Sequence, residues 1–167
     1  KELGDFTQGH YKIDSQSKNI NKAAFKLTRS GKISSSPVKI IKRIALNGND
    51  LTFAYRIKNE SSDYLRNLFG VEFNLSVFDN QLSKGQAGLE ADSIKVNDLW
   101  SGISLEFNLN LSASIWHFPI ETVSDSDTGI EKTYQELCLV FNWPLDIAPQ
   151  GEKLIRLNLR VGTSFND

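Results

Sequence analysis

Alternation of apolar and polar residues with a period of two most restricts how this chain of 167 residues can fold. In the segment 103–111 every odd position carries Ile, Leu or Phe, and the even positions between them carry Ser, Glu or Asn. Successive side chains of a β-strand point to opposite faces of a sheet, so this order gives one apolar and one polar face. The pattern predicts antiparallel strands that each cover a core with one face.

The same alternation recurs along the chain. It is found in five further segments: 23–27, 38–40, 51–57, 69–77 and 155–161. The segment 137–143 is apolar at both kinds of position, which is typical of a central strand covered on both faces. No window has the apolar spacing and caps of a long amphipathic helix, although a short helical turn fits at 61–67 or at 91–99.

Turn residues separate these runs. Asn47-Gly48-Asn49 suits a tight hairpin because Asn-Gly accepts positive φ angles, and Ser30-Gly31 predicts the end of an earlier hairpin. The polar cluster 125–129 predicts another turn, and the weakly patterned stretch 81–96 a long loop or an irregular pair of strands. Many strands at short spacing predict a single all-β domain over 1–167, a two-layer antiparallel β-sandwich with little or no helix.

Charge and hydropathy exclude several classes of partner. The net charge is −1, and the densest basic stretch, with Lys39, Lys42 and Arg43 among apolar residues, is interpreted as the polar face of a strand. We therefore expect no nucleic-acid partner. No stretch approaches the roughly 20 apolar residues of a membrane span, so no membrane partner is expected.

The cysteine and methionine content bears on the setting of the chain. Cys138 is the single cysteine and lies in an apolar run, which predicts a buried structural thiol. A chain without an internal disulfide fits a reducing compartment, and we expect a cytoplasmic location. The sequence contains no methionine, not even an initiator, which leads us to expect a piece of a longer protein.

Carboxylates are the first candidates for catalysis, since acid–base work needs two of them about 5 to 10 Å apart in one cleft. Four were considered: Glu72, Glu106, Glu121 and Glu131. Glu72 and Glu106 fall on the polar faces of their predicted strands, whereas Glu121 has aromatic neighbours. No pair stands out, and the sequence predicts no catalytic residue in this chain.

Metal and cofactor sites are also not expected. His10 and His117 are the two histidines and lie far apart in sequence. The turn that begins at Asp125 resembles a calcium loop at its first ligand positions, but Gly129 and Ile130 stand where an oxygen ligand and a glycine are required. Phosphate-binding loops and nucleophile elbows are absent from the sequence.

Aromatic residues near strand ends are the remaining candidates for a contact surface. They are Trp100, Trp116, Trp143, Tyr64 and Tyr134. Such a ring either fills the core or stacks on the apolar face of a sugar while neighbouring polar groups bind its hydroxyls. The segment 116–119 ends in Pro119, which cannot donate to a ladder, so it is predicted to depart from a regular strand and to form a contact surface.

Gly4-Asp5-Phe6 and the segments 69–75, 118–124 and 129–135 occur in one order over nearly the whole chain. Together they resemble the C-terminal β-sandwich domain of glycoside hydrolase family 57, the α-amylases and 4-α-glucanotransferases. The resemblance implies a galactose-mutarotase-like sandwich and a parent enzyme that acts on α-1,4-glucans with retention. The family's nucleophile Glu and acid/base Asp belong to the preceding catalytic barrel, and no residue here matches their motifs.

The resemblance implies a non-catalytic accessory domain from the C-terminus of a longer glycoside hydrolase, which packs on the catalytic barrel of the same chain and contacts α-glucan. Trp116, His117, Glu121 and Tyr134 are the predicted contact residues. Two alternatives stay open. One is an independent, lectin-like carbohydrate-binding module. The other is a small mutarotase-like enzyme, in which His117 and Glu121, four residues apart, would share one face of a strand.

Overall fold

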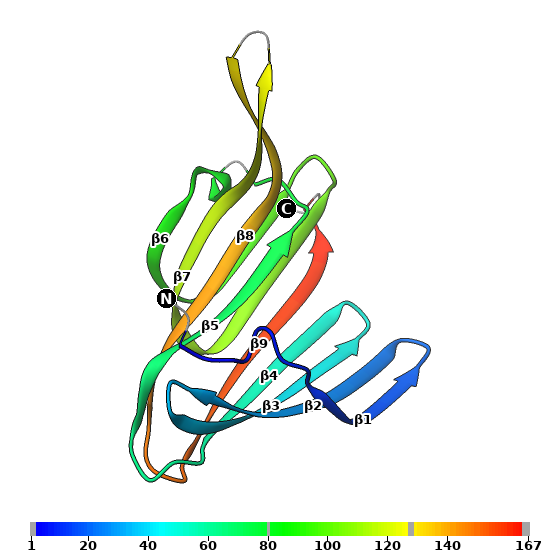
Figure 1. The fold of residues 1–167 in the computed structure, drawn as a ribbon. Coiled ribbons are helices and arrows are strands. Elements are labelled where there is room, and N and C mark those ends of the chain that lie inside the picture. Colours follow the sequence, from blue (N-terminus) through cyan, green and yellow to red (C-terminus); the bar gives the residue numbers. More distant parts are fainter. Residues whose placement is uncertain (1–2, 80, 127–128, 165–167) are drawn as a thin grey trace. The chain divides into compact units, whose positions relative to one another are not determined.

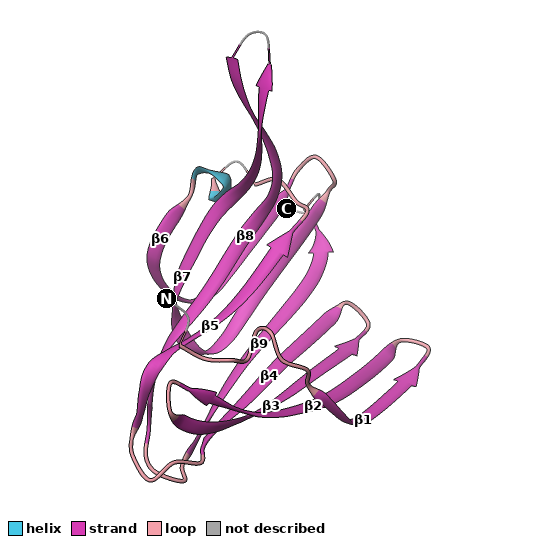
Figure 2. Ribbon diagram, viewed as in Figure 1, coloured by secondary structure: helices cyan, strands magenta, loops and turns pink. Residues whose placement is uncertain are grey.

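The computed structural model describes residues 3–79, 81–126 and 129–164. This part of the chain forms nine strands and one short 3₁₀ turn (Figures 1 and 2). They are β1 (Lys12–Asn19), β2 (Lys22–Ile33), β3 (Ser36–Asn47), β4 (Asp50–Asn59), β5 (Leu65–Leu75), η1 (Leu82–Lys84), β6 (Gln86–Asp98), β7 (Ile103–Ser126), β8 (Gly129–Ile147) and β9 (Glu152–Thr163). No helix among the described residues is long and apolar enough to cross a membrane.

The strands are antiparallel to their neighbours in the ladders β1–β2, β2–β3, β3–β4, β4–β9 and β7–β8. Hydrogen-bonded neighbours follow the order β1-β2-β3-β4-β9-β7-β8-β5, and β6 pairs with β7. The prediction of an all-β antiparallel fold is confirmed. Period-two alternation made this prediction possible, because each strand has one row of apolar side chains to bury.

The chain divides into two compact units, and its long strands contribute to both. Unit 1 consists of the described residues of Lys1–Leu68, Phe107–Leu111 and Pro144–Arg160. Unit 2 consists of those of Phe69–Glu106, Ser112–Trp143 and Val161–Asp167. The organisation of the chain as one domain stays a prediction.

Unit 1 is built on the meander β2-β3-β4 with β9 beside β4. Ile40 lies opposite Ile57, and Tyr55 lies opposite Ile155, so the buried rows of three strands coincide. Burying one such side chain contributes about 1.5–3 kcal/mol. Arg56, the residue between Tyr55 and Ile57, is exposed, as the alternation predicts.

Unit 2 is built around β8, and the prediction of a strand covered on both faces is confirmed. Leu139, Phe141 and Trp143 are at most 1% exposed, and Cys138, at one of the alternate positions of the same strand, is equally buried. The rings of Phe141 and Trp143 stack with centroids 6.2 Å apart, and Phe73 of β5 meets Phe141 edge-on at 5.9 Å. Figure 1 shows the free ends of β7 and β8 continuing as a two-stranded ribbon beyond β5 and β6.

One predicted hairpin turn is confirmed and one is wrong. Gly48, with a φ of 60°, connects β3 to β4 as expected. Ser30-Gly31 instead lies inside β2, where Gly31 pairs with Val38, and the chain reverses at Ser34, whose φ is 54°. Gly31 is needed for close packing, since an added Cβ would collide with the carboxylate of Asp5.

The stretch 81–96 is not a loop or an irregular strand pair, because it consists of η1 and most of the regular strand β6. The predicted helical turns are also wrong: 91–98 belongs to β6 and 65–67 to β5. The inward positions of β6 shift from Leu89 and Ala91 to Ile94 and Val96, and this change of phase hides the period of two. The predicted turn at 125–129 joins β7 to β8, and its residues 127–128 lie outside the described residues.

Asn59, which is fully buried in unit 1, provides a test of the fold. Its amide donates to the carbonyls of Asp63, Ile147 and Ala148 at 2.7, 3.0 and 3.1 Å. Asn59→Ala removes these bonds and the two that the amide oxygen accepts from Ser61, and it should lower the free energy of unfolding by about 2–4 kcal/mol in urea titrations. The exposed Asn158→Ala, which removes one surface hydrogen bond, should cost less than about 1 kcal/mol. Equal effects of the two substitutions would contradict this account.

Candidate functional site

Trp116 and its neighbours belong to the regular strand β7, contrary to the prediction of an irregular segment. Trp116 pairs with Val140 and Pro119 with Leu137, and the register is continuous between them. The Trp116 side chain is 41% exposed. The missing N–H of Pro119 therefore did not end the strand.

His117 is buried, with 4% of its surface exposed. Its Nδ1 lies 2.7 Å from the carbonyl oxygen of Leu82 in η1. Because a carbonyl can only accept, Nδ1 carries the proton and donates. His117 thus fastens η1 to β7.

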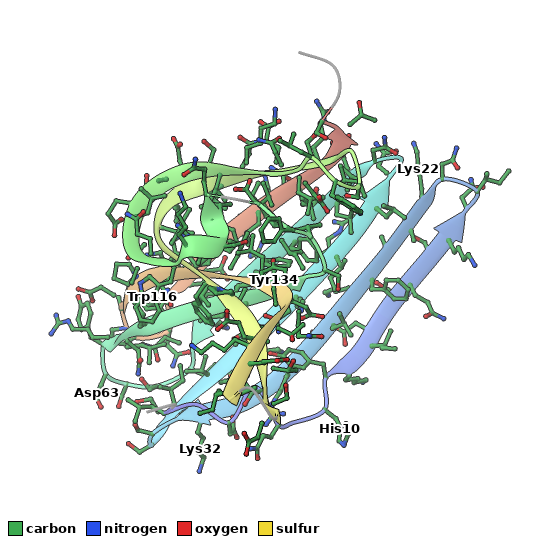
Figure 3. The ribbon with its side chains drawn as sticks, turned by 90° about the horizontal axis from the view of Figure 1, so that it is seen from above. His10, Lys22, Lys32, Asp63, Trp116 and Tyr134 are labelled. Carbon is green, nitrogen blue, oxygen red and sulfur yellow. The ribbon has the colours of Figure 1, made fainter. Side chains whose placement is uncertain are left out.

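Glu121 and Tyr134 pair across the β7–β8 ladder, beside a register shift between Ile120 and Glu121. Glu121 is exposed, and its carboxylate lies 3.7 Å from Nζ of Lys132. The half-buried Tyr134 donates its hydroxyl to the carbonyl of Val77, and burial raises the pKa of this phenol. Trp116 of β7 and Tyr134 of β8, both labelled in Figure 3, come from neighbouring strands of unit 2.

Unit 2 contains a hollow of about 700 Å³, hereafter the Trp100 hollow. Its lining comes from three stretches of the chain: Phe78, Asp79 and Gln81; Lys95, Asn97, Leu99 and Trp100; Thr163 and Ser164. Trp100 is 96% exposed, Leu99 65% and Phe78 44%. None of the four predicted contact residues lines this hollow, but the ring of Tyr134 meets Phe78 of its lining edge-on at 5.1 Å.

Two buried carboxylates hold the loops on either side of the Trp100 hollow. Asp79 accepts from the backbone N–H groups of Gln81, Leu82 and Asn97 at 2.8, 3.1 and 2.9 Å. Asp98 accepts from the N–H groups of Trp100 and Ser101 and from the Ser101 hydroxyl, at 2.9, 3.1 and 2.7 Å.

The Ser101 hydroxyl, together with backbone donors, holds the pKa of Asp98 below its ordinary value. Asp98 therefore stays ionised at neutral pH and keeps the loop that carries Trp100 in place.

Sequence reasoning counted Trp100 among the aromatic candidates but did not select it. A short sequence pattern around Trp100 could have indicated its exposure. Asp98 followed by Ser101 and Gly102 is typical of a turn in which an Asp side chain caps the backbone, and such a turn exposes the residue between them.

A second hollow, of about 550 Å³, lies in unit 1 and is strongly basic. Its charged lining consists of Lys26, Lys39, Arg43, Arg56, Lys58, Arg156 and one acid, Glu152. Lys39 and Arg43 share this face of β3. Lys42 lies over the ring of Tyr55 at 5.4 Å, where burial lowers the pKa of the lysine. The three basic residues are thus divided between the two faces of the strand, not gathered on one polar face.

The other chemical candidates are dispersed. Glu72, Glu106 and Glu131 are exposed, and so is His10. The residues described by the structure contain no cluster of three or more His, Cys, Asp or Glu that could hold a metal ion. The calcium-like turn after Asp125 includes residues 127–128, outside the described part of the chain.

Similarity to solved structures defines the class of fold. A galactose mutarotase-like protein from Clostridium acetobutylicum aligns with a TM-score of 0.59 over 92% of this chain and 66% of its own, at 9% identity. The chain is thus a β-sandwich of the galactose-mutarotase-like kind, as predicted. At this identity the similarity concerns the fold alone.

The family follows from closer matches. The family of α-amylase/4-α-glucanotransferase C-terminal domains matches residues 1–157, and the chain belongs to it. An α-amylase of Pyrococcus horikoshii is 31% identical over 99% of this chain and 23% of its own length. The crystal structure of 4-α-glucanotransferase from Thermococcus litoralis aligns with a TM-score of 0.76 and 27% identity, over 95% of this chain and 23% of that one. The chain thus spans less than a quarter of these relatives, and the resemblance seen in the sequence is confirmed.

Cys138 should be inert in the native protein. Its side chain is buried, and burial raises the pKa of the thiol to about 11. At pH 8 about one molecule in a thousand would carry the thiolate, the form that attacks disulfides. Ellman's reagent at pH 8 should therefore not label the native protein, and it should label the protein fully in concentrated guanidinium chloride. Rapid labelling of the native protein would contradict a buried thiol.

The same shift predicts a pH dependence of stability. The folded pKa lies above the unfolded value of about 8.5, so stability is fully present below pH 8.5 and falls as the pH rises toward 11. The Cys138→Ala variant should lack this component in urea titrations across that range.

Proposed function

We propose that the chain is a non-catalytic accessory domain of an α-glucan-active glycoside hydrolase or glucanotransferase, and that it packs on a catalytic barrel in the same polypeptide. The family match over residues 1–157 carries the proposal. The matched region is less than a quarter of relatives named α-amylase and 4-α-glucanotransferase, which leaves most of their length for the catalytic part. We further propose a cytoplasmic location for the protein and a direct contact of this domain with glucan.

The charges of the described residues support a non-catalytic role. Only two of their carboxylates are buried, Asp79 and Asp98. Each accepts three hydrogen bonds from loop donors, so both maintain backbone structure. A retaining glycosidase needs two carboxyl groups about 5–5.5 Å apart on either side of the scissile bond, and the exposed Glu121 is instead paired with Lys132.

The geometry does not favour a mutarotase-like enzyme. Such an enzyme requires a base and an acid that reach one substrate. His117 is buried with Nδ1 bonded to a backbone carbonyl, whereas Glu121 is exposed beside Lys132. Neither residue lines the Trp100 hollow.

The chain alone should neither hydrolyse maltoheptaose nor transfer its glucosyl units, as followed by chromatography of the products.

The gene sequence directly upstream of Lys1 should encode a barrel with its own Glu and Asp pair. Protein that includes this barrel should be active, and deletion of residues 1–167 should lower its melting temperature because an apolar contact surface becomes exposed. A start codon or a signal peptide just before Lys1 would refute the accessory role and favour an independent sugar-binding module.

A further inference from the structure

We propose that the Trp100 hollow is a binding subsite for an α-glucan chain, with the indole ring of Trp100 as its stacking platform. The proposal rests on the proposed function for the chemical class of the ligand. It differs from the sequence prediction, which selected Trp116 and its neighbours.

Trp100 has the exposure and the support that a platform requires. A tryptophan that is 96% exposed leaves a large apolar face in water, which is unfavourable unless a ligand covers it. The loop beneath the ring is fixed, because Asp98 accepts hydrogen bonds from the N–H groups of Trp100 and Ser101. The Ser164 hydroxyl also donates to the carbonyl of Asp98 at 3.3 Å, and the Ser164 N–H to that of Gly102 at 3.0 Å. A pre-ordered loop reduces the entropy lost on binding.

Phe78 provides the other apolar wall, and Tyr134 positions it. The ring of Phe78 is 44% exposed and meets the Tyr134 ring edge-on. Tyr134 is itself fixed by the hydrogen bond from its hydroxyl to the carbonyl of Val77. We therefore assign Tyr134 a positioning role behind the subsite.

The polar lining contains one cation, Lys95, and one acid, Asp79, beside neutral groups, and so suits a neutral polyhydroxylated ligand. Within the described residues, no side-chain polar atom of Gln81, Asn97 or Thr163 has a hydrogen-bond partner. The two amides and the hydroxyl both donate and accept, as sugar hydroxyls do. The carboxylate of Asp79 is already bound by three backbone donors and therefore does not require a cation.

The size and shape of the Trp100 hollow fit a short oligosaccharide. Its volume of about 700 Å³ falls within the roughly 300–1,000 Å³ of small-molecule sites. An apolar ring beside hydroxyl-binding groups matches a pyranose unit, which has an apolar face and a rim of hydroxyls. The basic hollow of unit 1, with six cations and one acid, lacks such a platform and would favour an anion.

Isothermal titration with maltoheptaose tests this subsite in the full-length protein, inactivated at its catalytic pair so that the probe is not consumed. Trp100→Ala should weaken binding at this subsite at least tenfold, and Trp100→Tyr, which keeps an aromatic face, should stay within about threefold of the unchanged protein. Trp116→Ala is the matched control, because it removes another exposed indole of unit 2 that lies outside the hollow, and it should leave the affinity unchanged. Maltoheptaose should also quench or shift the fluorescence of Trp100, and this change should disappear in Trp100→Ala.

Two results would overturn the subsite. One is an unchanged affinity in Trp100→Ala, and the other is an equal loss in Trp116→Ala. If the unchanged affinity in Trp100→Ala is accompanied by a lower melting temperature of the full-length protein, Trp100 is a contact to the catalytic part, so the subsite fails while the accessory function stands. The accessory function fails separately, if no barrel is encoded upstream.

Discussion

Everything described in unit 2 depends on the register of the β7–β8 ladder. In a strand that is apolar on both faces, the hydrophobic pattern alone does not fix the register, since a shift by one residue would still bury apolar side chains. Asn142 removes this ambiguity. It is buried within β8, and its amide donates to the carbonyl of Ser114 at 3.2 Å. Gly70 leaves room for it, since an added Cβ there would lie 3.3 Å from Oδ1 of Asn142. A shift by one residue would move Asn142 to the other face and take its buried amide away from this carbonyl, at about 1–3 kcal/mol.

That register explains why two residues selected from the sequence act as supports. His117 is held over η1, where it bonds Leu82, and Tyr134 is placed against Phe78. Nδ1 of His117 and the hydroxyl of Tyr134 each donate to a backbone carbonyl, so each side chain stabilises a neighbouring segment. Tyr134 thus supports Phe78, which lines the Trp100 hollow, and His117 supports η1, which directly follows Gln81 of the same lining.

The sequence predicted the parts of the structure that depend on local alternation. The segment 103–111 and the doubly buried 137–143 were recognisable because period two requires no knowledge of the partner strands. Prediction from the sequence failed where contacts between distant parts of the chain decided the structure. Gly31 suggested a turn, but the space that its missing Cβ leaves is occupied by Asp5, 26 residues earlier in the chain. The Trp100 hollow combines residues from three separate stretches, and no local pattern could have indicated that they meet.

The use of buried charge in unit 2 supports the proposed non-catalytic role. A catalytic acid must give up and regain a proton during turnover. Asp98 cannot do so without cost, because its hydrogen bonds stabilise the ionised form and protonation would weaken the bonds that hold Trp100. Asp79 likewise holds backbone in place, since it accepts hydrogen bonds from three backbone N–H groups. Carboxylates used in this way produce stiff loops with neutral polar side chains between them. This is the kind of surface that the proposed subsite for an α-glucan chain requires.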